Sequence, residues 1–127
     1  MADAVASQTL VDGPRHVVMK FTNVSDGTGE SAVLKVDVSG LSGAPTAVKI
    51  NRIHYATAGM GVRILWDATT DVDAFLIGPD QTGCLDFTGF GGLINNAGSG
   101  VTGDVMFTTV GHTAGDVYSL ILEMSKV

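Results

Sequence analysis

The segment Ser31-Ala-Val-Leu-Lys-Val-Asp-Val-Ser39 carries the clearest structural pattern in the chain. Apolar side chains occupy every second position from Ala32 to Val38, and mostly polar ones, including Lys35, lie between them. Successive side chains of a strand point to opposite faces, so the pattern predicts a strand with one buried and one wet face. Turn-forming residues fill positions 25–30 just before it, which predicts a hairpin with the strand upstream.

Similar alternation recurs roughly every ten residues, as in sandwiches and barrels. The pattern changes parity near residues 51–52, which predicts a β-bulge there. Residues 57–61 are predicted to be a hairpin turn and residues 111–115 a turn that reverses the chain, and no segment predicts a convincing helix. Besides 32–39, the predicted strands cover residues 9–11, 16–24, 48–55, 62–67, 74–77, 84–87, 105–109 and 117–124.

The composition favours the same fold class. The chain contains 16 Val, 13 Thr and 6 Ile, but only two Glu, so residues that pack well on sheets far outnumber helix formers. The 17 Gly supply turns. We therefore expect an all-β fold, an antiparallel β-sandwich of jelly-roll type with eight or nine strands. With 127 residues, the chain is expected to form an N-terminal arm over 1–14 and one domain over 15–127.

Charge and hydropathy exclude several kinds of partner. The net charge of −6 repels nucleic-acid backbones and anionic lipids, and no basic cluster offsets it. No segment approaches the roughly 20 apolar residues of a membrane helix. The first residues lack the basic and apolar regions of a signal peptide. We expect a soluble protein made in the cytoplasm, without nucleic-acid or membrane binding.

Residues suited to catalysis are few and scattered. Cys84 is the single cysteine, and we interpret it as a small buried apolar residue. His16, His54 and His112 are too far apart in sequence to suggest a zinc site, and they are expected at the surface or in loops. The sequence therefore predicts no enzyme. A histidine beside Cys84, or a deep pocket holding two carboxylates, would favour an enzyme instead.

Two ligand-binding alternatives rest on few residues. Asp67, Asp71 and Asp73 could gather calcium ligands, but the glycine and bidentate glutamate of a calcium loop are absent. We expect these aspartates to cap backbone groups in a turn, with no metal or cofactor. A carbohydrate- or receptor-binding module would need exposed Trp66 or Tyr55, whereas the alternation around Trp66 predicts a core position.

A resemblance to known proteins rests on residues 1–15, 20–23, 25–31, 64–67 and 107–116. These segments resemble small structural proteins of tailed bacteriophages, and the similarity runs over most of the chain. The resemblance implies a virion component, a capsid decoration or cement protein on the head surface. It further implies the major capsid protein as partner and self-association, with a trimer expected. A neck, tail or fibre-attachment role is the alternative.

Two regions are expected to contact partners. The arm before Pro14 can extend at about 3.3 Å per residue, which adds reach to a small domain. Residues 89–100 form the longest irregular stretch and are rich in glycine. The candidate interface residues are Val5, Thr9, Val11 and Pro14 in the arm, and Phe90, Leu93 and Ile94 in the long loop.

Overall fold

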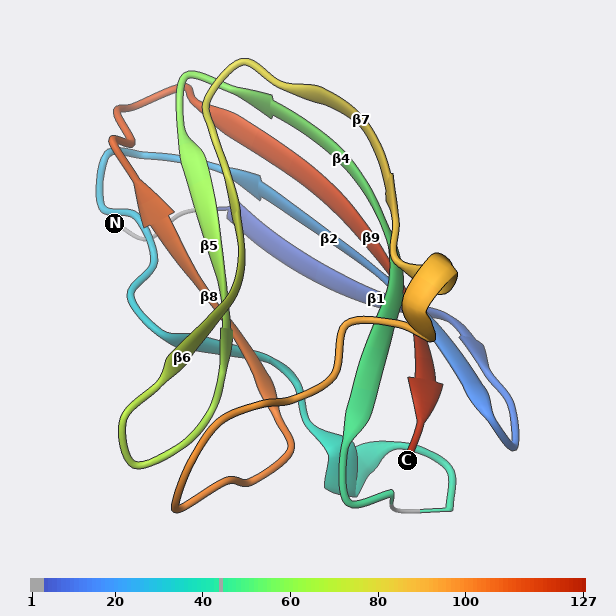
Figure 1. Ribbon diagram of the computed structural model, residues 1–127. Helices are drawn as coiled ribbons and strands as arrows, with labels where there is room; N and C mark the ends of the chain where they lie inside the picture. Colours follow the sequence, from blue (N-terminus) through green and yellow to red (C-terminus); the bar gives the residue numbers. More distant parts are fainter. Residues whose placement is uncertain (1–3, 44) are drawn as a thin grey trace.

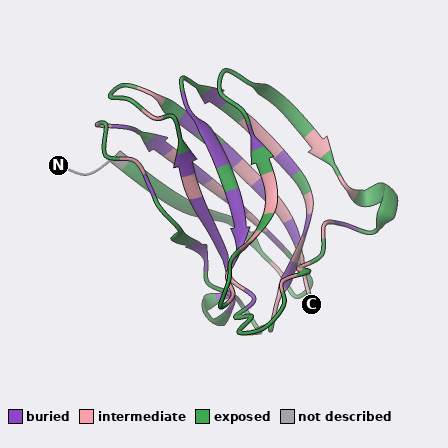
Figure 2. Ribbon diagram, turned by 60° about the vertical axis from the view of Figure 1, so that its left-hand side comes forward, coloured by how far each residue is buried: buried purple, intermediate pink, exposed green. Residues whose placement is uncertain are grey.

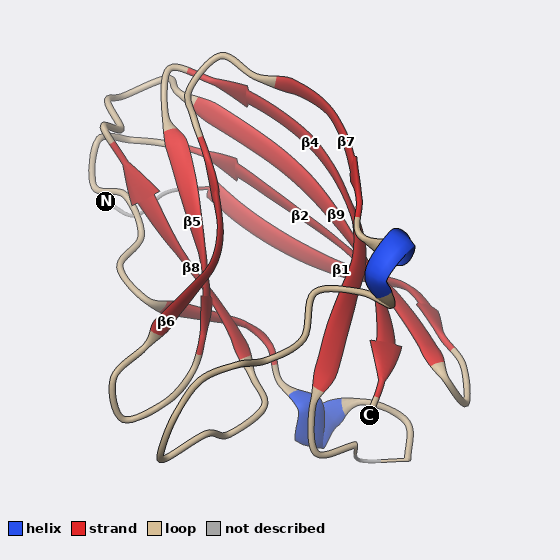
Figure 3. Cartoon of the chain, viewed as in Figure 1, coloured by secondary structure: helices blue, strands red, loops and turns tan. Residues whose placement is uncertain are grey.

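The computed structural model describes residues 4–43 and 45–127, which form nine strands and two short 3-10 turns (Figure 1 and Figure 3). All pairings between strands are antiparallel. One sheet has five strands in the order β1-β2-β9-β4-β7, and the other has four in the order β3-β8-β5-β6. The all-β prediction, with eight or nine strands in antiparallel sheets, is confirmed. The elements are β1 (Ala4–Asp12), β2 (His16–Val24), β3 (Val33–Val36), η1 (Val38–Gly40), β4 (Val48–Ala58), β5 (Gly61–Trp66), β6 (Val72–Ile77), β7 (Thr82–Asp86), η2 (Thr88–Phe90), β8 (Val105–Val110) and β9 (Val117–Lys126).

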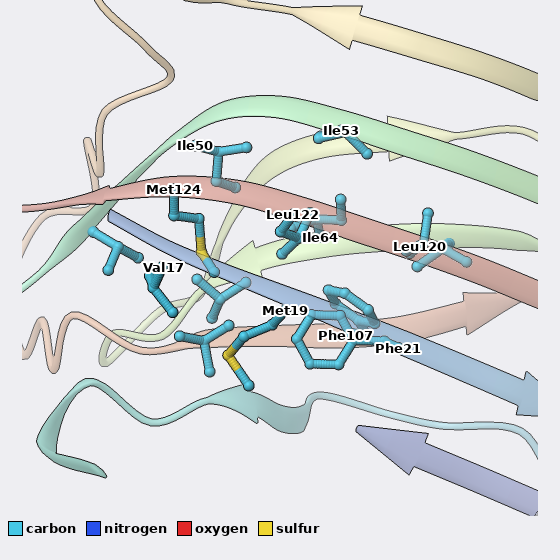
Figure 4. Close-up of a cluster of buried hydrophobic side chains, with 14 of the residues drawn as sticks. Val17, Met19, Phe21, Ile50, Ile53, Ile64, Phe107, Leu120, Leu122 and Met124 are labelled. Carbon is cyan, nitrogen blue, oxygen red and sulfur yellow. The ribbon is translucent and has the colours of Figure 1, made fainter. Parts of the chain in front are cut away.

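The two sheets pack face to face around one apolar core (Figure 2 and Figure 4). Every second side chain of β2 and β9 points into it, as the alternation predicts. The Phe21 ring on β2 meets the Phe107 ring on β8 edge-on at 5.1 Å between centroids, which joins the two sheets. Trp66 is completely buried, so its predicted core position is confirmed. Burial of each such side chain contributes about 1.5–3 kcal/mol.

The predicted bulge in β4 is present. The register of β4 against β9 shifts between Ile50 and Arg52. One extra residue at this point changes which face the following residues occupy. Ile50 and Ile53 consequently both point into the core, although strict alternation would put them on opposite faces.

The strand predicted over residues 32–39 is shorter in the structure. β3 ends at Val36, and its register against β8 shifts between Leu34 and Val36. Leu34 is half exposed, whereas Lys35, predicted on the wet face, is buried. The alternation identified a strand correctly but gave the wrong face for these two residues, because a bulge reverses the faces.

Lys35 is buried and pairs with Glu30, which belongs to the loop predicted over residues 25–30. Its Nζ lies 2.5 Å from Glu30 Oε2, and both side chains are almost fully shielded from solvent. Asn23 Nδ2 and Tyr118 Oη donate hydrogen bonds to Glu30 Oε1, at 2.9 and 2.5 Å. A buried charge needs such a set of partners to offset the loss of water. The group links β2, β3 and β9 at one end of the core.

The predicted hairpin between β2 and β3 is wrong. β2 lies between β1 and β9, whereas β3 pairs with β8 in the other sheet. The hairpin turn predicted at residues 57–61 is also wrong, because β4 and β5 lie in different sheets. The connection over 111–116 likewise crosses between the sheets. Backbone hydrogen bonds from Ser25 N to Asp116 O and from Gly115 N to Ser25 O hold two crossing loops together. Turn residues mark a reversal of the chain but not which strand the reversed segment pairs with.

The predicted arm is largely a strand. Ala4–Asp12 forms β1, which pairs antiparallel with β2 along its length and makes one edge of the five-stranded sheet. Residues 1–3 of the predicted arm lie outside the described residues. The sequence suggested pairing only near residues 9–11 because the side chains of β1 from Val5 to Asp12 are exposed and show no buried face. Main-chain hydrogen bonds to β2 hold this segment in the sheet. A pattern of side chains does not predict such bonds.

Candidate functional site

The loop after β7 places aromatic side chains at the surface. Asp86 ends β7 and accepts hydrogen bonds from Thr88 N at 2.9 Å and Thr88 Oγ1 at 2.6 Å. These hydrogen bonds lower the pKa of Asp86, and Arg52 adds a smaller effect. They start the η2 turn, which exposes Phe90 at its end.

The far end of this loop is fixed to the sheet. Leu93 and Ile50 exchange backbone hydrogen bonds of 2.7 and 3.0 Å, which adds a short bridge beside β4. Gly92 has a φ of +102°, and a Cβ there would meet Asn51 Oδ1 at 2.7 Å. A glycine is therefore required for this close approach. The loop is held at both ends, so its exposed apolar side chains are presented from a defined backbone.

We define an aromatic patch made of Phe87, Phe90, Leu93 and Ile94 of this loop and Phe75 of β6. Phe90 and Ile94 are its exposed members, whereas Phe75, Phe87 and Leu93 are partly buried against the core. The rings of Phe75 and Phe87 lie 5.6 Å apart, and those of Phe87 and Phe90 lie 6.1 Å apart. Phe90 is 70% exposed and Ile94 is 63% exposed. An open pocket of about 310 Å³ lies beside them and is lined by Phe90, Leu93 and Ile94 together with Trp66, Asp73, Ala74, Gly92 and Asn96. Exposed, contiguous apolar side chains mark sites of association.

The other predicted contact residues lie along β1. All residues from Val5 to Asp12 are exposed, and Figure 2 draws the strand that follows the N-terminus almost entirely as exposed. Val5 and Thr9 share a face, because they pair with the core residues Asn23 and Met19 of β2. Val11 and Pro14 are also exposed near the β1–β2 turn.

The β1–β2 turn is anchored to the other end of the chain. Lys126 Nζ donates hydrogen bonds to the Asp12 carboxylate, to Gly13 O at 2.6 Å and to Ser42 O at 2.8 Å. Ser42 N donates to Asp12 Oδ2 at 2.9 Å. The hydrogen bond from Lys126, followed by that from Ser42, lowers the pKa of Asp12. The C-terminal strand therefore secures the point where β1 turns into β2.

The structure does not join the seven predicted contact residues into one surface. β1 and β7 form opposite edges of the five-stranded sheet, so the aromatic patch and the β1 residues are separated by the width of that sheet. The sequence also missed two members of the patch, Phe75 and Phe87. Phe75 comes from β6 in the other sheet, and no signal in the sequence pairs it with the loop after β7.

Cys84 contradicts its predicted burial. It lies exposed on β7, because it shares the outer face of the sheet with His54, whereas the next residue, Leu85, pairs with the buried Ile53 and packs against the core. Its partner across the strands is His54 of β4, whose Nε2 contacts the Glu123 carboxylate. A thiol, an imidazole and a carboxylate therefore follow one another on an open sheet face, with no hydrogen bond recorded between Cys84 and His54. An enclosed site for a reacting carbonyl group would need donors around the thiol, whereas this face has a shallow, open hollow of about 200 Å³ whose lining includes His54, Ser119 and Ile121.

The carboxylates considered for calcium binding have protein partners. Asp71 accepts from Ala68 N, Asp67 from Thr102 Oγ1, and Asp73 pairs with Arg63. Within residues 4–43 and 45–127, no group of three His, Cys, Asp or Glu side chains is placed to hold a metal ion. These aspartates act as turn caps and in an ion pair.

The aromatic platform of a carbohydrate-binding module is not present at the predicted residues. Trp66 is buried, and the half-buried Tyr55 covers Gly83, where an added Cβ would lie 3.0 Å from the tyrosine hydroxyl. Stacking against a sugar needs an open aromatic face, so this arrangement weighs against that alternative.

No family model matches the chain, and no curated protein matches it. Among the described residues, no helix has the length and apolar character required to cross a bilayer.

Proposed function

We propose that the chain is a structural virion protein, a capsid decoration protein that binds and stabilises the assembled head of a tailed bacteriophage. The observation that carries the proposal is the aromatic patch, whose exposed members Phe90 and Ile94 lie on a loop fixed at both ends. Aromatic side chains on a preorganised surface are the usual anchors of protein interfaces. The proposal assigns adhesion to the chain and no catalytic step.

We further infer that the two sheets form a jelly roll. A jelly roll is one long antiparallel hairpin wrapped into two sheets, so the first of its eight strands pairs with the last. The observed pairs β2–β9, β3–β8, β4–β7 and β5–β6 follow this order, with β1 added beside β2. Jelly rolls build both viral capsid and lectin domains. The burial of Trp66 favours the capsid class over the lectin class.

Stabilisation follows from selective binding. A protein that binds only the assembled lattice shifts the equilibrium towards that lattice by mass action. Many copies around one head add their contributions. The partner expected from the resemblance is the major capsid protein, and the aromatic patch is the surface proposed to contact it.

The test compares two variants on purified heads that lack the protein. Phe90→Ser combined with Ile94→Ser removes the exposed anchors, each worth about 1.5–3 kcal/mol if buried in the complex. We expect affinity for heads to fall at least about tenfold, because each 1.4 kcal/mol corresponds to a factor of ten. Val101→Ser is the matched control, since Val101 is exposed in the same long loop but lies outside the patch.

Two readouts decide the outcome. Sedimentation with heads measures binding, and thermal melting of heads with and without the protein measures stabilisation. Equal melting temperatures would rule out a stabilising role, and equal binding by the double variant and the control would rule out the patch. Electron microscopy of labelled particles separates the head from the neck, tail or fibre-attachment positions.

A further inference from the structure

β1 presents a free backbone edge that differs from the other three sheet edges. In the described residues, β1 pairs with β2 on one side and with nothing on the other. It is nine residues long, and its one charged residue, Asp12, is the last and is bonded to Lys126. The other edge strands, β3, β6 and β7, have four, six and five residues, and each contains a charged residue.

Such an edge is usually protected. Proteins shorten edge strands, or place lysine, proline or inward-pointing charges on them, because unpaired N–H and C=O groups recruit other strands. β1 has none of these between Val5 and Thr9, and its bulge lies beyond Thr9. This five-residue stretch is regular, uncharged and exposed on both faces. It therefore offers main-chain donors and acceptors to another strand.

We propose that β1 pairs antiparallel with β1 of a second copy of this chain. The two five-stranded sheets then form one continuous ten-stranded sheet across a twofold axis. Pairing centred on Ser7 uses only the regular stretch and places Val5 of one copy opposite Thr9 of the other. Opposed β-branched residues are favourable cross-strand pairs.

Three observations select a second copy as the occupant. β1 is the longest edge in the described chain, so only another β1 matches its length. Antiparallel pairing of identical strands is self-complementary, as a twofold interface requires. Each copy carries a net charge of −6, which opposes association of two copies. The stretch from Val5 to Thr9 contains no charged residue, so no like charges would meet at this contact. The aromatic patches remain free, because they lie at the opposite edges of the joined sheet.

Dimerisation through β1 is tested on the full chain alone, without phage heads. A chain that does not dimerise can therefore be distinguished from a chain that does not bind heads. Sedimentation equilibrium over a range of concentrations is expected to give twice the chain mass. Ser7→Lys places two lysines opposite each other at the axis, and we expect the dimer dissociation constant to rise about tenfold or more. Ser119→Lys is the matched control, since Ser119 is exposed on the central strand β9.

A charge-reversal mixture separates loss of pairing from loss of folding. Ser7→Lys and Ser7→Glu variants are each expected to be monomeric, and an equimolar mixture is expected to recover dimers. Amides on the outer edge of β1 should exchange slowly in the dimer and rapidly in the monomeric variants. A wild-type mass of one or three chains, or a Ser7→Lys variant that dimerises like wild type, would overturn the proposal.

Discussion

At the scale of single residues, the buried Glu30–Lys35 pair is expected to be highly sensitive to substitution. Glu30→Gln keeps an oxygen to accept from Asn23 and Tyr118 but leaves the buried Lys35 ammonium without its carboxylate. Removing one partner of a buried pair costs about 3–5 kcal/mol. We expect the free energy of unfolding in urea to fall by about this amount.

The Arg63–Asp73 pair is the matched control. Its side chains are exposed by 46% and 39%, and its N–O distance is 2.9 Å. Exposed pairs contribute about 0–1 kcal/mol, so Asp73→Asn should have a small effect. Similar losses for the two variants would contradict the view that burial makes the Glu30–Lys35 pair important.

Two other residues show how far side-chain chemistry predicts position. Trp66 lies in an alternating segment of a strand flanked by β8 and β6, and its predicted burial is correct. Cys84 also has an apolar side chain but is exposed, because it lies on the outer face of its sheet opposite His54, while its neighbour Leu85 faces the core. Residue type indicates a preference for the core, but the face of the sheet on which a residue lies decides whether it reaches the core.

At the scale of elements, the β1–β2 turn is expected to depend on pH. Hydrogen bonds from Lys126 and Ser42 lower the pKa of Asp12 below its ordinary value of 3.8. A carboxyl group with a lowered folded-state pKa stabilises the fold above its unfolded pKa, and this contribution is lost as pH falls through the folded pKa. Asp12→Asn should therefore be less stable than wild type at pH 5, and the difference should shrink below about pH 3.8.

Urea midpoints measured at several pH values give this difference directly. Lys126→Met removes the group with the largest effect on the Asp12 pKa, so its difference from wild type should shrink over the same range. A gap between wild type and Asp12→Asn that stays constant down to pH 2–3 would show that the Asp12 carboxylate does not stabilise the turn.

Elements also differ in how well local sequence predicts them. The bulge in β4 was predictable, because a bulge reverses the parity of neighbouring apolar residues within one strand. The partner of β3 was not, since the turn residues at 25–30 are equally compatible with a hairpin and with a crossing to the other sheet. The aromatic patch was predicted only in part, because Phe75 reaches it from β6.

At the scale of the whole molecule, the net charge of −6 is expected to affect the proposed attachment to phage heads. If acidic loops meet basic patches on the head, attachment is expected to weaken as salt rises, because the Debye length falls from about 10 Å at 0.1 M to about 3 Å at 1 M. Binding titrations over this range check the expectation. Binding that is unchanged by salt would indicate contact through the aromatic patch alone.

The two proposed surfaces lie at opposite edges of one sheet. A dimer joined through β1 would present two aromatic patches at its outer ends. Two linked contacts on one head raise the effective concentration of the second. Loss of dimerisation in Ser7→Lys should therefore weaken attachment to heads without altering the patch itself.

The sequence by itself determined that the chain is all-β, the approximate positions of its strands, and most of the residues that fill the core. These properties follow from the alternation of side chains, which is read over a few neighbouring residues, and from the composition of the whole chain. Only the tertiary structure decided which strands pair, which strands lie at the edges, and which loop residues come together. Those outcomes depend on main-chain hydrogen bonds between distant segments, and all residues except proline offer the same donor and acceptor whatever their side chain.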